Sequence, residues 1–224
     1  MSDRISIITV TYNAAETLEE TIQSVVSQDY PEIEYLIIDG GSTDGTQEIV
    51  EKYRAHINIF VSEPDKGIYD AINKGIKLSS GRIIKIQNAD DLLMPGAVSA
   101  AMRELARFPQ EEPVILIGYS RVIDTGGKFL GRITKRPIII GFDTFNHPGW
   151  FATSNVYEEF GPYSLDYKIA SDYEYYLRVK TGGGKIHWLA RDVACYRQDG
   201  VSSGFDGVRE VAQINRLYYG PLHS

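Results

Sequence analysis

The chain has 224 residues, of which 43% are hydrophobic and 24% charged, and these proportions are typical of a folded protein rather than a disordered one. The length allows one large domain or two small ones. The formal net charge of −7 argues against a general nucleic-acid-binding surface. The single cysteine, Cys195, cannot form an internal disulfide, which fits a reducing compartment.

No targeting or membrane-spanning pattern is present in the sequence. The N-terminal residues pass directly into a strand-like run without a signal-peptide pattern, and no apolar stretch is long enough to cross a bilayer. We therefore expect a cytoplasmic protein. The segment 209–219 mixes aromatic and basic residues, so peripheral contact with the inner face of a membrane stays open.

Strand and helix patterns alternate through the first half of the chain. β-Branched and apolar runs predict strands at 5–11, 33–38, 57–61 and 82–87. Apolar residues at helical spacing predict helices at 14–27, from 43 or 44 to about 54, and at 67–78. This alternation predicts βαβ units and a mainly parallel sheet. Right-handed crossovers would bring the loops after Thr11, Ile38 and Gln87 to one edge of that sheet.

The second half has a less regular pattern. Thr125-Gly126-Gly127 separates two strand-like runs, 114–123 and 128–133, and predicts a hairpin. The stretch 141–164 is irregular and rich in Phe, Trp, Pro and Gly. No clean linker or internal repeat divides the chain, so we expect a single α/β domain. Beyond the irregular stretch we expect a helix at 170–180 and strands at 185–189 and 193–197.

The most informative motif is Asn88-Ala89-Asp90-Asp91, which follows the predicted strand 82–87. Open α/β sheets bind ligands at the carboxyl ends of their strands. Carboxylates and amides without nearby Cys or His suit a hard cation such as Mg²⁺ or Mn²⁺, which usually also holds substrate phosphates. Taken alone, the same residues also make an ordinary turn or helix start.

Four motifs, taken together and in order, resemble those of the family 2 glycosyltransferases. The resemblance extends over about residues 5–203 and implies an inverting enzyme of the GT-A type. It implies a Rossmann-like single domain with a mostly parallel central sheet flanked by helices. Residues 1–110, approximately, would bind the nucleotide sugar, and residues 111–224 the acceptor. The four motifs are Ile8–Asn13, Ile37–Thr46, Asn88–Asp91 and Ala170–Arg178.

The resemblance assigns donor-binding roles to residues at several strand ends. Asp39 would accept a hydrogen bond from the nucleobase, namely from N3–H if the base is uracil, although Asp39-Gly40-Gly41 also makes a tight turn. Thr9, Thr11 and Tyr12 end the first strand, where the family binds base and ribose; packing in the strand is the alternative for Thr9.

The predicted helix 67–78 resembles a family segment that contacts the nucleotide. Asp70 and Asn73 lie three residues apart and therefore on one helical face. They are the candidates for that contact. The alternative is a solvated helix start capped by Asp65.

Asn88-Ala89-Asp90 stands where the family has its D-x-D motif. By resemblance Asp90 is the ligand of a divalent metal, Mg²⁺ or Mn²⁺, and Asp91 supports it or the ribose. Asn88 departs from the usual aspartate; it could still bind ribose or a metal-bound water, but it carries no charge. Such a cation would offset the negative charge on the leaving diphosphate.

Asp172 is the candidate general base, because it aligns with the base of the family's acid-rich helix start. An inverting transfer needs one carboxylate to take the proton of the acceptor hydroxyl, on the face opposite the diphosphate. An N-cap is the alternative role for Asp172. If both roles hold, Asp90 and Asp172 must face one shared cleft.

Two further residues are weaker candidates. His147 lies where many relatives have a histidine before the acceptor region and could contact the acceptor or a phosphate; a structural role is the alternative. Arg197 follows the last predicted strand and could pair with the diphosphate, or it could simply be a surface arginine.

These residues predict an enzyme that moves one sugar from a nucleotide-diphospho sugar to a hydroxyl acceptor. The acceptor would be a glycan or lipid-linked glycan in the synthesis of surface polysaccharide or glycolipid. The alternatives are a nucleotidyltransferase, which would normally have a Gly-rich phosphate loop absent at 11–15, and a sugar-nucleotide-binding pseudoenzyme. The sugar, base, acceptor and oligomeric state are not specified by the sequence.

Overall fold

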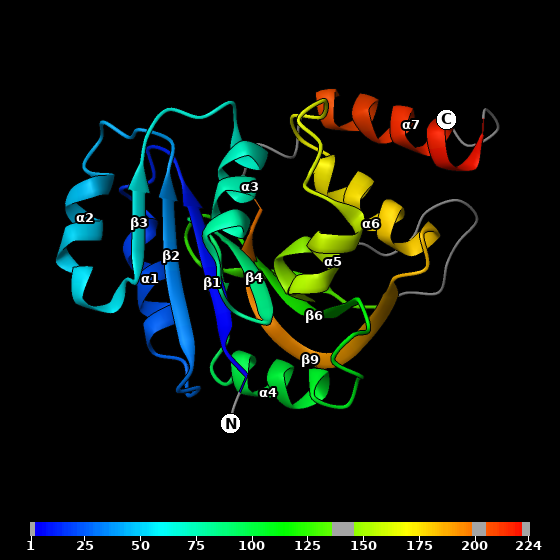
Figure 1. The fold of residues 1–224 in the computed structure, drawn as a ribbon. Coiled ribbons are helices and arrows are strands. Elements are labelled where there is room, and N and C mark those ends of the chain that lie inside the picture. The colour runs from blue at the N-terminus through cyan, green and yellow to red at the C-terminus, as the bar shows by residue number, and fades with distance from the viewer. Residues whose placement is uncertain (1–2, 136–145, 199–204, 221–224) are drawn as a thin grey trace.

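The fold is described by a computed structural model, which covers residues 3–135, 146–198 and 205–220. Within these ranges, helices cover both faces of one sheet, which has the strand order β3-β2-β1-β4-β8-β6-β9-β5, with β7 paired to β6 (Figure 1). The α/β fold class predicted from the sequence is confirmed.

The N-terminal part of the sheet is parallel, as the alternating pattern predicts. Strand β1 pairs in parallel with β2 on one side and with β4 on the other, and β2 pairs with β3. In register, Thr11 lies beside Asp39 and Val10 beside Asn88, so these strand ends meet at one edge of the sheet. The elements are β1 (Ile5–Thr11), α1 (Leu18–Val26), β2 (Ile33–Asp39), α2 (Thr46–Lys52), η1 (Arg54–His56), β3 (Ile59–Ser62), α3 (Ile68–Leu78) and β4 (Ile83–Asn88).

Alternation along the strands divides the core between the two faces of the sheet. Ile8 and Val10 belong to the cluster formed with α3 and the C-terminal helices, whereas Ile5 and Ile7 pack with α1 and the helix α4 (Ala97–Leu105). Because both faces are covered, every residue of β1 is buried. The faces of the sheet are therefore covered by two helical layers, and the ends of the strands are left to present side chains to a ligand.

The C-terminal part of the sheet is mixed rather than parallel. Strand β8 runs antiparallel between β4 and β6, while β6 and β9 are parallel. The predicted hairpin joins β6 and β7. The elements here are β5 (Leu92–Leu93), α4 (Ala97–Leu105), β6 (Val114–Ile123), β7 (Phe129–Ile133), η2 (His147–Gly149), β8 (Trp150–Thr153), α5 (Ser154–Phe160), α6 (Ser171–Thr181), β9 (Lys185–Arg197) and α7 (Phe205–Tyr219).

Two expectations for this part were wrong. The runs 185–189 and 193–197 form one bent strand, β9, because its register against β6 shifts near Tyr119 instead of breaking (Figure 1). The stretch expected to be irregular contains β8 and α5 within its described residues, whereas 141–145 lie outside them. Strand β8 has only four residues, all buried, and so shows no alternation.

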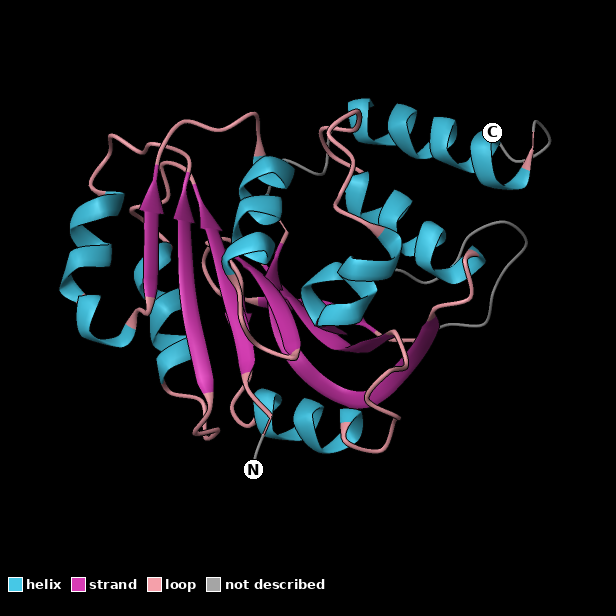
Figure 2. Cartoon of the chain, in the orientation of Figure 1, coloured by secondary structure: helices cyan, strands magenta, loops and turns pink. Residues whose placement is uncertain are grey.

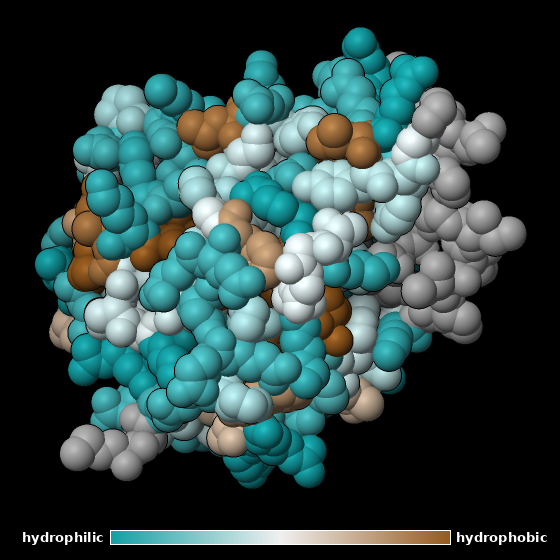
Figure 3. Space-filling view, turned by 45° about the vertical axis from the view of Figure 1, so that its right-hand side comes forward, coloured by the Kyte–Doolittle hydropathy of each residue, from teal (hydrophilic) through white to brown (hydrophobic). Residues whose placement is uncertain are grey.

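The helices of the second half gather on one side of the sheet. Figure 2 shows α5, α6 and α7 beyond the C-terminal strands, with α4 on the opposite side. On the face shown in Figure 3, hydrophobic groups are separated by hydrophilic ones. No helix in the described part of the chain is long and apolar enough to cross a membrane.

Candidate active site

A cavity of about 1040 Å³ lies at the carboxyl ends of β1 and β4 and extends to the start of α6. Two segments distant in sequence form its walls, because the first half of the chain supplies the strand ends and the second half supplies η2 and α6. Among the predicted site residues, the cavity brings together Thr11, Tyr12, Asn88, Asp90, His147, Asp172 and Arg197.

Three residues of the Asn88–Asp91 turn, namely Asn88, Ala89 and Asp90, line the cavity. Asn88 Nδ2 donates to Asp91 Oδ2 (3.0 Å), and the backbone N–H of Arg197 donates to Asp91 Oδ1 (3.2 Å). Asp91 is thereby buried beneath the turn and does not line the cavity. Asp90 does line it. The turn divides the adjacent carboxylates into one that faces the cavity and one that supports the loop.

Burial sets the charge of the groups beneath this turn. It raises the pKa of Asp91 to about 7, helped by the neighbouring charge of Asp90 and opposed by the hydrogen bonds just described. Burial also raises the pKa of Asp90. It lowers the pKa of the fully buried Lys85 to about 7, against the attraction of Asp91. Lys85 Nζ donates to Ile86 O (2.5 Å) and Pro148 O (2.9 Å), which ties β4 to η2.

Asp172 lines the cavity at the first turn of α6. Its Oδ1 accepts the backbone N–H of Tyr173 (2.8 Å) and lies 3.1 Å from the hydroxyl of Tyr69 on α3, whose single hydrogen is shared with the backbone oxygen of Ile169 (2.6 Å). Burial raises the pKa of Asp172 to about 6, although both of these donors favour the charged form. The carboxylate is therefore fixed in position and basic enough to accept a proton near neutral pH.

His147 opens η2 and is almost fully buried at the cavity wall. Its Nε2 lies 3.2 Å from the hydroxyl of Tyr163, and its ring packs edge-on against Trp150. Burial, reinforced by the charge of Lys85, lowers the pKa of His147 to about 3. The imidazole is consequently neutral at physiological pH, so it could contact a ligand as a dipole rather than as a cation.

Three predicted donor-binding side chains bond within the protein instead of lining the cavity. Asp39 is fully buried and accepts hydrogen bonds from Ser42 N (3.0 Å), Ser42 Oγ and Ser62 Oγ (2.6 Å), which fold the loop after β2. Thr9 Oγ1 pairs with Tyr35 Oη (3.0 Å) in the core. Asn73 exchanges hydrogen bonds of 2.9 Å with the backbone of Tyr163.

Asp70 is also outside the cavity lining. Its carboxylate accepts the N–H of Lys66 (3.1 Å) and pairs with Lys74 Nζ (3.6 Å), so it secures the first turn of α3. Helical spacing was sufficient to place Asp70 and Asn73 near each other. It could not show that neighbouring loops would take up their hydrogen bonds.

Asp65 and Tyr69 line the cavity, although the sequence analysis gave them no site role. Asp65 was weighed only as a helix cap, and Tyr69 is a buried aromatic residue of an amphipathic helix. Asp65 reaches the cavity because the loop after β3 meets the loop after β2. Tyr69 reaches it because α3 packs against the start of α6. Sequence periodicity carries no signal for either contact.

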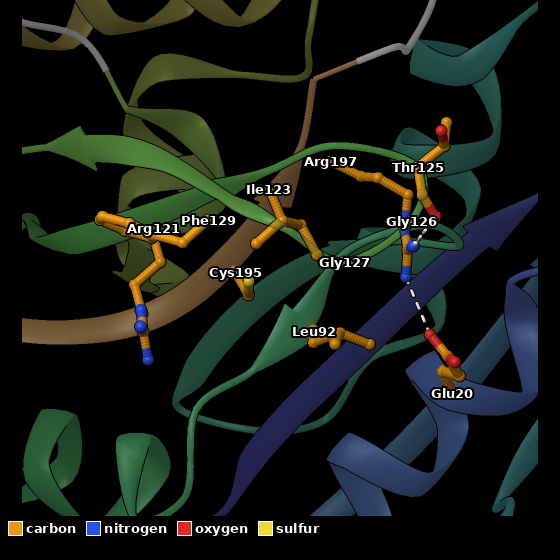
Figure 4. A pocket seen from close by; sticks show the side chains of 10 residues that line it. All are labelled: Glu20, Leu92, Arg121, Ile123, Thr125, Gly126, Gly127, Phe129, Cys195 and Arg197. Carbon is orange, nitrogen blue, oxygen red and sulfur yellow. Dashed lines mark hydrogen bonds and ion pairs between the residues drawn. The ribbon is translucent and has the colours of Figure 1, made fainter.

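A smaller cavity of about 360 Å³ lies beside the first and is lined by both arginine and apolar side chains (Figure 4). Arg197 and Thr125 line both cavities. The Arg197 guanidinium donates to Asp90 O (3.1 Å), Thr125 O (3.1 Å) and Glu20 (2.8 Å). It therefore joins the acidic turn to the β6–β7 hairpin and to α1, which leaves it little capacity for an additional anion.

A cation at the acidic turn would need ligands from outside the protein. Within the described residues, no group of three or more His, Cys, Asp or Glu side chains could hold a metal ion. The oxygen donors Asp90 and Asn88 at the cavity wall suit Mg²⁺ or Mn²⁺. Magnesium commonly binds through one or two carboxylates together with substrate phosphates, so the donor set fits a cation that arrives with a phosphate ligand.

The chain belongs to glycosyl transferase family 2, whose family model matches residues 6–165. It is 32% identical over 206 residues to a PGL/p-HBAD biosynthesis glycosyltransferase of Mycobacterium tuberculosis, covering 87% of this chain and 77% of the relative. It is also 32% identical over 179 residues to an uncharacterized glycosyltransferase of the same organism, covering 78% of this chain and 68% of that relative. This family membership favours sugar transfer over the nucleotidyltransferase alternative.

Solved structures have the same fold. Staphylococcus aureus TarS superposes with a TM-score of 0.75 at 19% identity, covering 96% of this chain but only 39% of TarS. A fragment of TarS, residues 1–349, has been solved with UDP-GlcNAc. The mannosyltransferase PcManGT of Pyrobaculum calidifontis, solved with GDP-Man and Mn²⁺, gives a TM-score of 0.65 at 22% identity, covering 89% of this chain and 59% of that one.

Proposed function

We propose that this chain is an inverting, metal-dependent glycosyltransferase that moves a sugar from a nucleotide-diphospho sugar to a hydroxyl acceptor. The observation that carries the proposal is that Asp90 and Asp172 line one cavity, although they lie on β4's end and on α6. The first part of the chain, to about residue 110, would bind the donor, and the remainder would bind the acceptor.

Asp90 and Asn88 would hold Mg²⁺ or Mn²⁺ together with phosphate oxygens of the donor. Such a cation, when bound, offsets charge on the leaving diphosphate. Asn88 also bonds to Asp91 and so fixes the turn that presents Asp90. Arg197 would stabilise the turn by donating a hydrogen bond to the backbone carbonyl of Asp90, without contacting the donor. In this proposal Asp39 and Asn73 shape the donor site without touching the donor.

Asp172 would take the proton from the acceptor hydroxyl as its oxygen attacks the anomeric carbon. An in-line displacement then inverts that carbon, because the alcohol enters opposite the departing diphosphate. The Tyr69 hydroxyl and the Tyr173 N–H hold the carboxylate at the cavity wall. Neutral His147, on the neighbouring wall, is suited to contact the acceptor or a phosphate by hydrogen bonding.

Relatives support the class of acceptor. The names of similar proteins refer to the synthesis of PGL/p-HBAD and, over 90 residues at 36% identity in Bacillus subtilis TuaG, of teichuronic acid. We therefore infer a glycan or lipid-linked glycan acceptor in surface polysaccharide or glycolipid synthesis. For a lipid-linked acceptor, the proposal includes peripheral contact of the protein with the inner face of the membrane.

The test is to measure hydrolysis and transfer of nucleotide sugars with Mn²⁺, with EDTA, and with the Asp90→Ala variant. We expect turnover that needs the cation and falls by at least about a hundredfold in Asp90→Ala. Undiminished turnover in EDTA and in the variant would contradict metal dependence. Calorimetric donor binding without turnover over a broad acceptor panel would instead support the pseudoenzyme alternative.

A further inference from the structure

Helix α7 lies beside α6, the helix whose first turn carries Asp172 (Figure 1). Ile214 of α7 is fully buried in the same core cluster as Leu177 of α6. The hydroxyl of Tyr173, also on α6, donates to Asn215 Oδ1 on α7 (2.8 Å) in the interior. Helix α7 is therefore packed directly against the turn that presents the proposed base.

Glu210 of α7 binds the backbone that leads into α6. Its Oε1 accepts the N–H of Lys168 (2.8 Å), and its Oε2 accepts those of Ile169 (2.9 Å) and Ala170 (2.8 Å). Partial burial favours the neutral acid, yet these three donors and the charge of Lys168 keep the pKa of Glu210 below its ordinary value. The side chain is therefore a charged acceptor for three consecutive amides at neutral pH.

The segment that Glu210 holds is part of the cavity wall. Lys168 and Ile169 line the cavity, and Asp172 follows them closely in the chain. The carbonyl of Ile169 accepts the Tyr69 hydroxyl (2.6 Å), the same hydroxyl that lies 3.1 Å from Asp172 Oδ1. A movement of this segment would therefore displace both the proposed base and the hydroxyl beside it.

We propose that Glu210 is a positioning residue of the transfer reaction, which holds the segment 168–170 so that Asp172 faces the acceptor hydroxyl. The inference rests on the proposed function, because Asp172 is the base of that function. In the described part of the chain no other side chain accepts these three N–H groups, so removal of the carboxylate leaves them without a protein acceptor. A displacement of about 1 Å at a reacting group can lower turnover about a hundredfold.

Glu210 also places a negative charge near Asp172. Burial is the main cause of the raised pKa of Asp172, and the charge of Glu210 adds to it. Tyr69 on α3 and Tyr163 are the other titratable groups that interact with this carboxyl, and Lys168 lines the same cavity. Removal of the Glu210 charge should therefore lower the pKa of Asp172, which a purely structural contact would not do.

The experiment is steady-state hydrolysis of UDP- and GDP-linked hexoses by the whole chain with Mn²⁺, in which Asp172 would activate water. With the donor that the wild type hydrolyses fastest, we expect Glu210→Ala to lower kcat at least about tenfold while the donor KM stays within about threefold. Glu210→Gln retains one acceptor oxygen and should restore kcat to within about threefold of wild type. Both variants should lower the pH midpoint of kcat/KM, because both remove the charge.

Tyr218→Phe is the matched control, because it removes a different bond between the same two helices. The Tyr218 hydroxyl donates to Glu174 Oε1 (2.7 Å), away from the segment 168–170. The control should keep kcat within about twofold of wild type and leave the pH midpoint unmoved. Unfolding midpoints would confirm that each variant is folded, and if Glu210→Ala were unfolded, the pH midpoint of Glu210→Gln would decide.

Wild-type kcat in folded Glu210→Ala, or an unmoved midpoint in Glu210→Gln, would overturn the inference alone. An equal loss of kcat in Tyr218→Phe would also overturn it, since docking of α7 would then explain the effect. If the wild type hydrolysed none of these donors, or if Asp172→Asn were fully active, the proposed function would fail as well.

Discussion

Acidic residues in the segment that ends β2 and follows it have a different use from those after β4 and at the start of α6. Asp39 is buried and bonded to Ser42 and Ser62, and Asp44, although it lines the cavity, accepts hydrogen bonds on both oxygens from Ala15 and Thr46. Asp90 and Asp172 line the cavity, and burial raises the pKa of both. Some carboxylates of these motifs therefore stabilise the loops around the cavity, whereas others remain available for binding or catalysis.

The largest expected effect is on turnover when the available carboxylate of α6 is neutralised. Asp172→Asn should lower the turnover number by about 10²–10⁴-fold, the usual contribution of a general base. Steady-state transfer assays with saturating donor would measure it. Asp166→Asn, an exposed acid just before the same helix, should remain within about twofold of wild type. Equal activity in all three proteins would remove Asp172 from the mechanism.

A loop-building carboxylate should instead matter for stability. Asp39→Ala leaves the N–H and hydroxyl of buried Ser42 without their acceptor and also removes the bond from Ser62, an exposed residue, so the free energy of unfolding should fall by about 2–4 kcal/mol. Urea unfolding would measure this loss. Asp65→Ala should cost less than about 1 kcal/mol. If Asp39→Ala were fully stable yet failed to bind nucleotide, Asp39 would have to be reassigned to the donor.

Arg197 joins the two regions, and its removal should have a smaller, mixed effect. Arg197→Ala loses the bonds to Asp90 O and Thr125 O, which should cost about 2 kcal/mol of stability and reduce turnover about tenfold. Glu20→Gln provides the comparison, since Glu20 is 63% exposed and its ion pair should contribute less than about 0.5 kcal/mol. Thermal melts and transfer rates would measure both variants. If Arg197→Ala and Glu20→Gln had equal effects, the guanidinium would act only through Glu20, which would contradict the prediction.

The sequence predicted the parallel half of the sheet well because each strand there is a β-branched run between helical patterns. The motif containing Asp90 and the helix start containing Asp172 were singled out by their resemblance to the motifs of the family. Neither local patterns nor motifs predict hydrogen bonds that depend on contacts between distant segments. Residues Asp39 and Asn73 matched family positions, but their bonding partners, Ser62 and Tyr163, are set by tertiary packing.

Missed elements have physical reasons as well. Strand β8 (Trp150–Thr153) is too short and too uniformly buried to show a period. The bend in β9 lies at Ala190 and Arg191, polar and small residues that resemble a loop but are accommodated by a register shift against β6. The position of Asp65 in the cavity depends on two loops meeting at Gly40, which no periodicity predicts.

The smallest expected effect concerns how Tyr69 tunes Asp172. The pKa of Asp172 is raised by burial to about 6, and the Tyr69 hydroxyl opposes this by favouring the charged carboxylate. Since the base acts deprotonated, kcat/KM should rise with pH through a midpoint near 6. Tyr69→Phe removes the opposing donor, raises the pKa further and should move the midpoint up by about half to one pH unit.

The control for this pH profile is Tyr157→Phe, which removes a buried hydroxyl of the same aromatic cluster. No bond between Tyr157 and Asp172 appears among the described contacts, so its midpoint should not move. A downward shift in Tyr69→Phe, or the same shift in both variants, would show that the hydroxyl does not stabilise the ionised base.

The central claim is that Asp90 and Asp172 serve opposite ends of one cleft, and calorimetric titration of the donor with and without Mn²⁺ tests it most directly. We predict that Asp90→Ala loses the Mn²⁺-dependent part of donor binding, whereas Asp172→Ala binds the donor within about threefold of wild type yet does not transfer sugar. Loss of Mn²⁺-dependent binding in both variants, or in neither, would contradict the claim.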